Sequence, residues 1–245
     1  MNGMDNTRDS ENFSTTEQVC RRLQKIPRRE EFKPEPSSVD PALLLNYRVW
    51  NQAILLRVLE LGSATLKLWN QNQAVSAAIL TRAILETVAL YYHIQNTLKG
   101  AVDTGKTNDA VNTLWKAGLG RHSKLKLKNK PENIQAQWYN AIEIKKFAED
   151  LCNWSPEARD AYGELSEIVH PNNKGCVDAY ATPVQENQLF RFTGDFSHIE
   201  SQFGCVLSFS LQFFENMRKD MDRLMEQFIQ VYAMNLNNSD NNDAL

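Results

Sequence analysis

Apolar side chains recur along much of the chain at helical spacing, three or four residues apart. The clearest example follows Asp40-Pro41, which has the form of a helix N-cap and the proline favoured at the first helical position. The apolar positions behind it are Leu43, Tyr47, Trp50, Ile54, Val58, Leu61 and Leu68. This spacing predicts a helix with one buried face.

A second predicted helix, over residues 73–98, is apolar almost all round. One side carries Leu80, Ile84, Val88 and Tyr91, and the other carries Val75, Ile79 and Ala89. Such a helix is typical of the interior of a bundle. Shorter helices are predicted near 109–115, over 131–151, and from Ser155-Pro156 to His170, where Pro171 ends the helix.

The final helix is predicted to begin near Asp195 and to be the longest. Its apolar stripe consists of Phe196, Ile199, Phe203, Val206, Ser210, Phe213, Met217, Met221, Leu224, Phe228 and Val231. Residues 189–192, just before it, have the pattern of a short strand. The whole pattern predicts an all-α protein, a helical bundle of five or six helices.

The polar stretches set the expected domain organisation. Residues 1–39 carry dense charge of both signs and predict a flexible arm with a short helix over 17–26. Residues 40–234 are expected to form a single helical domain. The Asn- and Asp-rich residues 235–245 predict a disordered tail.

Composition narrows the class of protein. With 10 Gly and 8 Pro in 245 residues, a turn-rich all-β fold is excluded, and a net charge of −3 argues against a globally basic nucleic-acid binder. The cysteines, Cys20, Cys152, Cys176 and Cys205, are too far apart for a zinc motif or a disulfide framework. There is no apolar signal core and no uninterrupted apolar span of about 18 residues. The sequence therefore predicts a soluble, cytoplasmic protein.

Arg82 and Glu86 are the first candidate site. They are four residues apart and so share one face of an otherwise apolar helix. One interpretation is a structural ion pair that fixes the packing of the helix. The other is that Arg82 lines a polar cleft and binds an anion such as phosphate.

Ser166 and His170 are the second candidate site, again four residues apart at the end of a helix. The negative end of the helix dipole favours a protonated histidine, which could act as general acid or base, or could cap the last carbonyls. No nucleophile-elbow motif accompanies the serine, so a serine hydrolase is excluded. Glu167-x-x-His170 occurs without a second copy, and no Gly-rich phosphate loop is present, so neither a metal nor a cofactor is expected.

A basic segment is the third candidate. Five cations occur within ten residues without an acid, on an otherwise acidic chain: Arg121, Lys124, Lys126, Lys128 and Lys130. They form either a patch that attracts phosphates or an exposed solubilising loop.

Together these residues carry a resemblance. Arg82-x-x-x-Glu86, followed by Tyr162-x-x-Leu-Ser-Glu-x-x-His-Pro-Asn, resembles a group of uncharacterised all-helical bacterial proteins that are in turn similar to the HEPN (higher eukaryotes and prokaryotes nucleotide-binding) superfamily. The resemblance covers roughly residues 42–175. It implies a helical bundle, often dimeric, and in many members a metal-independent ribonuclease of toxin–antitoxin or phage-defence systems.

The superfamily's catalytic signature is an arginine followed, after four to six residues, by a histidine on the same helix. His170 matches the histidine, whereas Gly163 to Leu165 contain no arginine. The resemblance then leaves Arg82, on a neighbouring helix, as the residue that would take the arginine's place.

Two functions follow as expectations. In the first, the protein is a HEPN-like binding or regulatory module, possessing a buried polar network of Arg82, Glu86, Ser166 and His170 on two core helices. In the alternative, it is a metal-independent ribonuclease in which His170 is the acid–base catalyst, Arg82 clamps phosphate and Glu86 orients Arg82. Both interpretations imply RNA or a protein as partner, a homodimer and no membrane.

Overall fold

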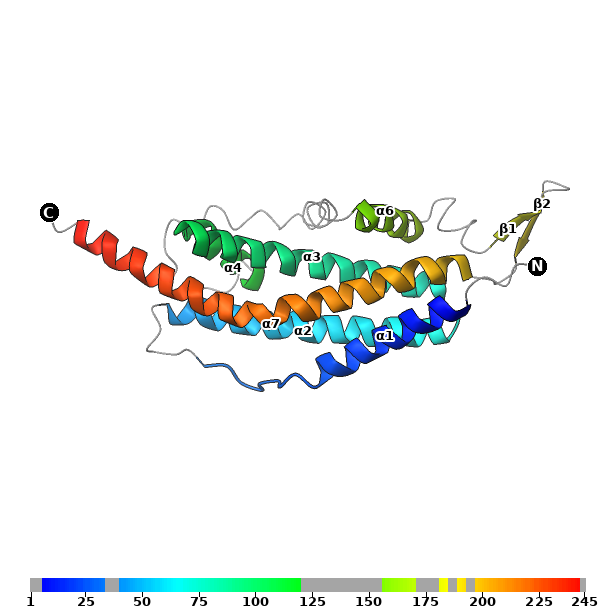
Figure 1. Cartoon of the computed structure of the whole chain (residues 1–245), viewed down its shortest axis with the longest axis horizontal. Coiled ribbons are helices and arrows are strands. Elements are labelled where there is room, and N and C mark those ends of the chain that lie inside the picture. Colours follow the sequence, from blue (N-terminus) through cyan, green and yellow to red (C-terminus); the bar gives the residue numbers. More distant parts are fainter. Residues whose placement is uncertain are drawn as a thin grey trace. The chain divides into compact units, whose positions relative to one another are not determined.

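The computed structural model describes residues 6–33, 40–119, 156–170, 181–184, 189–192 and 197–242 (Figure 1). Its helices are α1 (Asn6–Gln24), α2 (Pro41–Asn70), α3 (Ala74–Thr104), α4 (Asn108–Leu119), α6 (Pro156–Val169) and α7 (Ser197–Asn242). The strands β1 (Ala181–Val184) and β2 (Leu189–Phe192) pair antiparallel. The all-α class is confirmed, and the strand predicted at 189–192 is present as β2.

Local sequence signals explain where the helices begin and end. The Asp40 carboxylate accepts a hydrogen bond from the backbone amide of Leu43 at 2.9 Å, which caps α2 as predicted. Between α2 and α3, Asn72 adopts a left-handed backbone with φ of 56°, which asparagine tolerates better than most residues. The α3 helix continues past the predicted end at 98 and stops where Gly105, at φ of 72°, leaves the helical conformation.

The chain divides into two compact units. The first comprises Met1–Ile26, Leu56–Ala89 and Lys145–Glu215, and the second comprises Pro27–Leu55, Leu90–Ile144 and Asn216–Leu245. Each of α2, α3 and α7 contributes residues to both units. The sequence predicts a single helical domain over residues 40–234 and gives no indication of this division into two units.

The first unit buries apolar side chains from every described helix that contributes to it. They include Val19 and Leu23 of α1, Val58 of α2, Ile84 and Val88 of α3, Leu165 of α6, and Phe203, Leu207, Leu211 and Phe214 of α7. Within α1, α3 and α7 these positions are three or four residues apart, so each of these helices turns one face inward.

The α1 helix departs from the sequence expectation. It runs from Asn6 to Gln24, and it buries Thr16, Val19, Cys20 and Leu23. The guanidinium of Arg22 also donates two hydrogen bonds of 2.8 Å to Glu215 of α7. The prediction of a flexible arm is therefore wrong for α1, because a short apolar stripe hidden among charges is enough to pack it.

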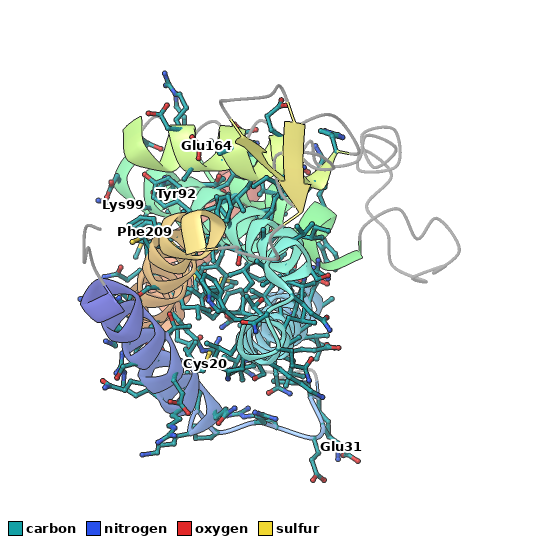
Figure 2. The ribbon with its side chains drawn as sticks, turned by 90° about the vertical axis from the view of Figure 1, so that its right-hand side faces the viewer. Cys20, Glu31, Tyr92, Lys99, Glu164 and Phe209 are labelled. Atoms are coloured by element: carbon teal, nitrogen blue, oxygen red, sulfur yellow. The ribbon has the colours of Figure 1, made fainter. Side chains whose placement is uncertain are left out.

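Small side chains let α1 approach α2. A methyl group at Gly62 would lie 3.2 Å from the Cys20 sulfur, tighter than an ordinary contact. Figure 2 shows Cys20 directed from α1 toward the helices of the unit. Burial, aided by the charge of Glu17, raises the pKa of the Cys20 thiol to about 11.

The second unit has its own core. Its buried apolar side chains include Leu43, Tyr47 and Trp50 of α2, Tyr91, Ile94 and Leu98 of α3, Leu114 of α4, and Met217, Met221, Met225 and Phe228 of α7. The Asn46 amide on α2 donates to the Leu114 carbonyl at 2.9 Å and so ties α4 to this core.

The end of α7 also differs from expectation. The helix continues to Asn242 instead of giving way to a disordered tail at 235. The amide of Asn235 donates to the Gly105 carbonyl at 2.6 Å and to the Thr107 hydroxyl at 3.2 Å, which joins α7 to the link between α3 and α4. The prediction is wrong here because a polar side chain supplies the contact that a search for apolar residues overlooks.

One described helix, α3, is long and apolar enough to cross a membrane by length and composition, with a mean hydropathy of 1.5 in its most apolar window. Of that window, 56% is buried inside the protein, and the core helix of a soluble protein passes the same test.

Candidate functional site

The structure brings Arg82 and Glu86 together on α3, in the first unit. Arg82 Nε donates to Glu86 Oε1 at 2.9 Å, and the two side chains are 21% and 25% exposed. Tyr162 of α6 completes the cluster, because its hydroxyl lies 3.4 Å from the same carboxylate oxygen and its ring lies under the guanidinium at 5.4 Å. The ion pair predicted from the sequence is present, at the partly exposed margin of the core.

Electrostatics hold this cluster in fixed charge states. Burial lowers the pKa of Arg82, but the hydrogen bond with Tyr162 and the charge of Glu86 outweigh it, so the net pKa is raised. Burial raises the pKa of Tyr162 against the opposing effect of Arg82. At neutral pH the guanidinium is therefore charged and the phenol protonated.

Ser166 and His170 are not joined to one another. The Ser166 hydroxyl donates to the backbone carbonyl of Tyr162 at 2.7 Å, an i−4 bond that is common for serine in helices. His170 is exposed just after the end of α6. Within the described part of the chain, no hydrogen bond or ion pair links His170 to Arg82, Glu86 or Ser166. The catalytic roles of Arg82, Glu86 and His170 stay predictions.

The basic segment, with Arg121, Lys124, Lys126, Lys128 and Lys130, lies outside the described residues, as does the helix predicted over 131–151. Its function as a phosphate-attracting patch stays a prediction.

A larger polar cluster lies in the second unit, around Asn51 of α2. The Asn51 amide oxygen accepts hydrogen bonds from the Tyr91 hydroxyl at 3.0 Å and from Arg218 Nη1 at 2.8 Å. Its amide nitrogen donates to Asp222 Oδ1 and to the Tyr47 hydroxyl, both at 3.2 Å, and that hydroxyl itself donates to Asp222 at 2.9 Å. Five side chains from three helices thus form one hydrogen-bonded network.

The members of this network differ in how far their side chains are exposed to solvent. Tyr91, Tyr47 and Asn51 are 0%, 3% and 5% exposed, Arg218 is half-buried, and Asp222 is exposed. The Tyr91 ring also stacks on Trp50 with centroids 5.4 Å apart, which fixes its hydroxyl in place.

Both tyrosines of the network remain protonated at ordinary pH. Burial is the largest cause that raises the pKa of Tyr47, and the charge of Asp222 adds to it. Burial also raises the pKa of Tyr91, against the opposing effect of Arg218. Each phenol is therefore a fixed hydrogen-bond donor and is not poised to exchange protons near neutral pH.

A pocket of about 680 Å³ adjoins the network in the second unit. Its lining comes from the segment after α1, from α2 and from α7: Pro27, Arg29, Phe32, Leu44, Tyr47, Arg48, Asn51, Gln52, Arg218, Asp222, Met225, Glu226, Ile229 and Gln230. Its volume lies within the range of small-molecule sites, and most of its lining residues are charged or carry an amide.

Gln52 holds one wall of the pocket. Its side-chain oxygen accepts from the Arg29 backbone amide at 2.8 Å, and its nitrogen donates to the Arg29 carbonyl at 2.6 Å. This two-point contact fixes the segment Pro27–Phe32 against α2. The segment thereby becomes a wall of the site.

The spacing of apolar residues along the sequence does not reveal this site. By their spacing, Tyr47 and Tyr91 belong to the apolar stripes of their helices, and this spacing does not show what their hydroxyls bind. The available signal was Asn51, a polar residue four positions after Tyr47 on the buried side of α2. A buried amide must find partners, and here they are on α3 and α7.

In the described part of the chain, no group of three or more His, Cys, Asp or Glu side chains is arranged to hold a metal ion. Comparison of the chain with protein-family models, curated proteins and solved structures finds no match.

Proposed function

We propose that this protein is a helical binding module whose ligand site is the pocket of the second unit. The observation that carries the proposal is the Asn51-centred network beside that pocket, in which Arg218 and Asp222 are hydrogen-bonded to the buried Asn51 side chain. A satisfied buried network fixes the positions of its members and favours recognition at a preformed site. It therefore supports binding more directly than it supports catalysis.

The predicted ribonuclease is the alternative. Its catalytic set lies in the first unit, where Arg82 is engaged by Glu86 and Tyr162 and His170 is exposed without a link to them. A ribonuclease would need a second copy or a bound RNA to bring these groups together. The HEPN resemblance, the homodimer and the cytoplasmic location remain part of the proposal as predictions from sequence.

Two measurements test the binding module together. The first screens small anions, amino acids and nucleotides by thermal shift, on the wild type and on Ile229→Trp, which fills the pocket. We expect at least one class to raise the melting temperature of the wild type but not of the variant. Circular dichroism of the variant must match that of the wild type.

The second measurement incubates the protein with labelled single-stranded RNA in EDTA, beside His170→Ala. We expect no cleavage by either protein. Cleavage that disappears in His170→Ala would establish the ribonuclease instead. Absence of any pocket-dependent ligand would overturn the binding module as assigned to this pocket.

A further inference from the structure

Two opposite charges stand on one wall of the pocket without pairing. Arg218 and Asp222 are four residues apart on α7, a spacing at which side chains of opposite charge can reach one another. Instead, Asn51 lies between them, with its amide oxygen toward Arg218 and its nitrogen toward Asp222. In the part of the chain that the structure describes, no direct ion pair joins the two.

Both charged groups keep capacity for a ligand. The hydrogen bonds from Arg218 to Asn51 use only Nη1, and a guanidinium has five N–H donors. The bonds that Asp222 accepts from Tyr47 and Asn51 both end on Oδ1, and its side chain is exposed. A carboxylate has acceptor sites on both oxygens, so Oδ2 faces no donor from the network.

The charges around the pocket argue against a simple ion as ligand. Arg29, Arg48 and Arg218 contribute positive charge, and Asp222 and Glu226 contribute negative charge. An anion would meet the two carboxylates, and a cation would meet the three guanidinium groups. A molecule with both charges can satisfy each side.

We propose that this pocket binds a free α-amino acid, with the ligand's carboxylate on Arg218 and its ammonium group on Asp222. Side chains four apart on a helix have Cβ atoms about 5–6 Å apart. A carboxylate and an ammonium group on one carbon, each with a charge-assisted hydrogen bond of about 2.8 Å, can bridge that distance.

The rest of the lining sets the expected side chain of the ligand. Phe32, Leu44, Met225 and Ile229 supply apolar and aromatic surface. A ligand with a large apolar side chain, such as phenylalanine or leucine, buries the most area there. This inference rests on the proposed function, because it names the ligand class of the same pocket.

The test is calorimetric titration of extensively dialysed protein with L-phenylalanine and L-leucine. Phenethylamine, which lacks the carboxylate, and 3-phenylpropionate, which lacks the ammonium group, are the matched ligands. We expect each to bind at least tenfold more weakly than L-phenylalanine. If phenethylamine binds as tightly as L-phenylalanine, the placement of the ligand's carboxylate on Arg218 is overturned. If 3-phenylpropionate does, the placement of the ammonium group on Asp222 is overturned.

The variants Asp222→Asn and Arg218→Gln should each weaken L-phenylalanine binding at least tenfold. Arg223 and Asp220 provide the control, since they form an exposed ion pair on the same helix, at 3.0 Å, and do not line the pocket. Asp220→Asn and Arg223→Gln should bind as the wild type does. If Arg218→Gln fails to fold, Asp222→Asn and the two analogues still decide the question.

The outcomes separate this inference from the proposed function. A pocket-dependent ligand of another class, with no amino acid bound, would overturn the amino-acid assignment and leave the binding module in place. No pocket-dependent ligand at all would overturn both.

Discussion

Asn51 occupies a buried position of α2 between Tyr47 and Leu55, where an aliphatic residue would continue the apolar face. Its amide is the only group in the Asn51-centred network that bonds to all four of the other members. Removing that amide would break the 3.0 Å hydrogen bond from the buried Tyr91 hydroxyl and the bonds that the amide nitrogen donates to Tyr47 and Asp222. Arg218 Nη1 would keep only its longer bond of 3.4 Å to the Asn51 backbone carbonyl. Each buried polar group left unpaired costs about 1–3 kcal/mol.

We therefore expect Asn51→Leu to lower the free energy of unfolding by about 2–3 kcal/mol. Asn96→Leu, at an exposed position of α3, is the matched control and should change it little. Urea denaturation followed by circular dichroism measures both. A loss for Asn51→Leu no larger than for Asn96→Leu would contradict a stabilising role for the network.

Cys20 makes a prediction about pH. Its thiol has an ordinary pKa of 9.0 and a folded-state pKa of about 11, so folding favours the neutral form. The associated stability is complete below pH 9 and is lost as pH rises from 9 through 11. By linkage, the wild type should lose about 2 kcal/mol of unfolding free energy from this group between pH 8 and pH 10.5.

The comparison is with Cys20→Ala, which lacks the titrating group. Tyr47 and Tyr91 also have raised pKa values and destabilise both proteins at high pH, so the difference between the two proteins isolates Cys20. Equal slopes of stability against pH in the two proteins would show that the thiol is not desolvated.

At the scale of the helices, close packing between α1 and α2 depends on a pair of small residues. Alanine at Gly62 would gain about 1 kcal/mol from helix propensity. Against this, its methyl group would press on the Cys20 sulfur at 3.2 Å, while its contacts with Leu211 at 3.7 Å are ordinary. The gain in helix propensity and the close contact with sulfur therefore oppose each other in the wild type. In a protein without the Cys20 sulfur, only the gain remains.

We expect Gly62→Ala to stabilise a Cys20→Ala protein by about 1 kcal/mol and to stabilise the wild type clearly less, or to destabilise it. Gly100→Ala on α3 is the control, since nothing lies within 4 Å of its added methyl group. That substitution should give the same gain in both backgrounds. A double-mutant cycle by chemical denaturation measures the coupling, and a coupling near zero would refute the close contact.

The sequence predicts where helices begin better than it predicts which distant segments contact one another. Asp40-Pro41 located the start of α2, and Ser155-Pro156 located the start of α6, because capping is a local property of a few residues. The packing of α1 and the anchoring of Asn235 were missed, since both depend on partners distant in the sequence, Glu215 and Gly105 among them.

The same reason explains the outcome for the candidate sites. Arg82 and Glu86 were paired correctly because they are neighbours on one helix. The network of Tyr47, Asn51 and Tyr91 with α7 could not be predicted, because spacing within a helix does not say which residues of another helix lie opposite. The spacing of residues within one helix predicts its buried face and the ion pairs along it. A site formed by several helices can be located only when the three-dimensional fold is known.

At the scale of the whole molecule, the two units share continuous helices. Residues of α2, α3 and α7 belong to both units, so unfolding one unit would end three helices in mid-course and expose backbone groups at each new end. Nucleating or ending a helix without a cap is unfavourable. The connection through three helices should therefore couple the stability of the two units.

We expect a single thermal transition, shifted as a whole by a change in either unit. Asn51→Leu tests the second unit, and Leu85→Ala, at a buried position of α3, tests the first with an expected loss of about 2–5 kcal/mol. Both variants should lower one common melting temperature, whether it is followed by far-ultraviolet dichroism or by calorimetry. Two transitions, each moved by only one of the variants, would show that the units unfold independently. In that case the shared helices must break at the boundary at little cost, and the pocket of the second unit would depend on its own core alone.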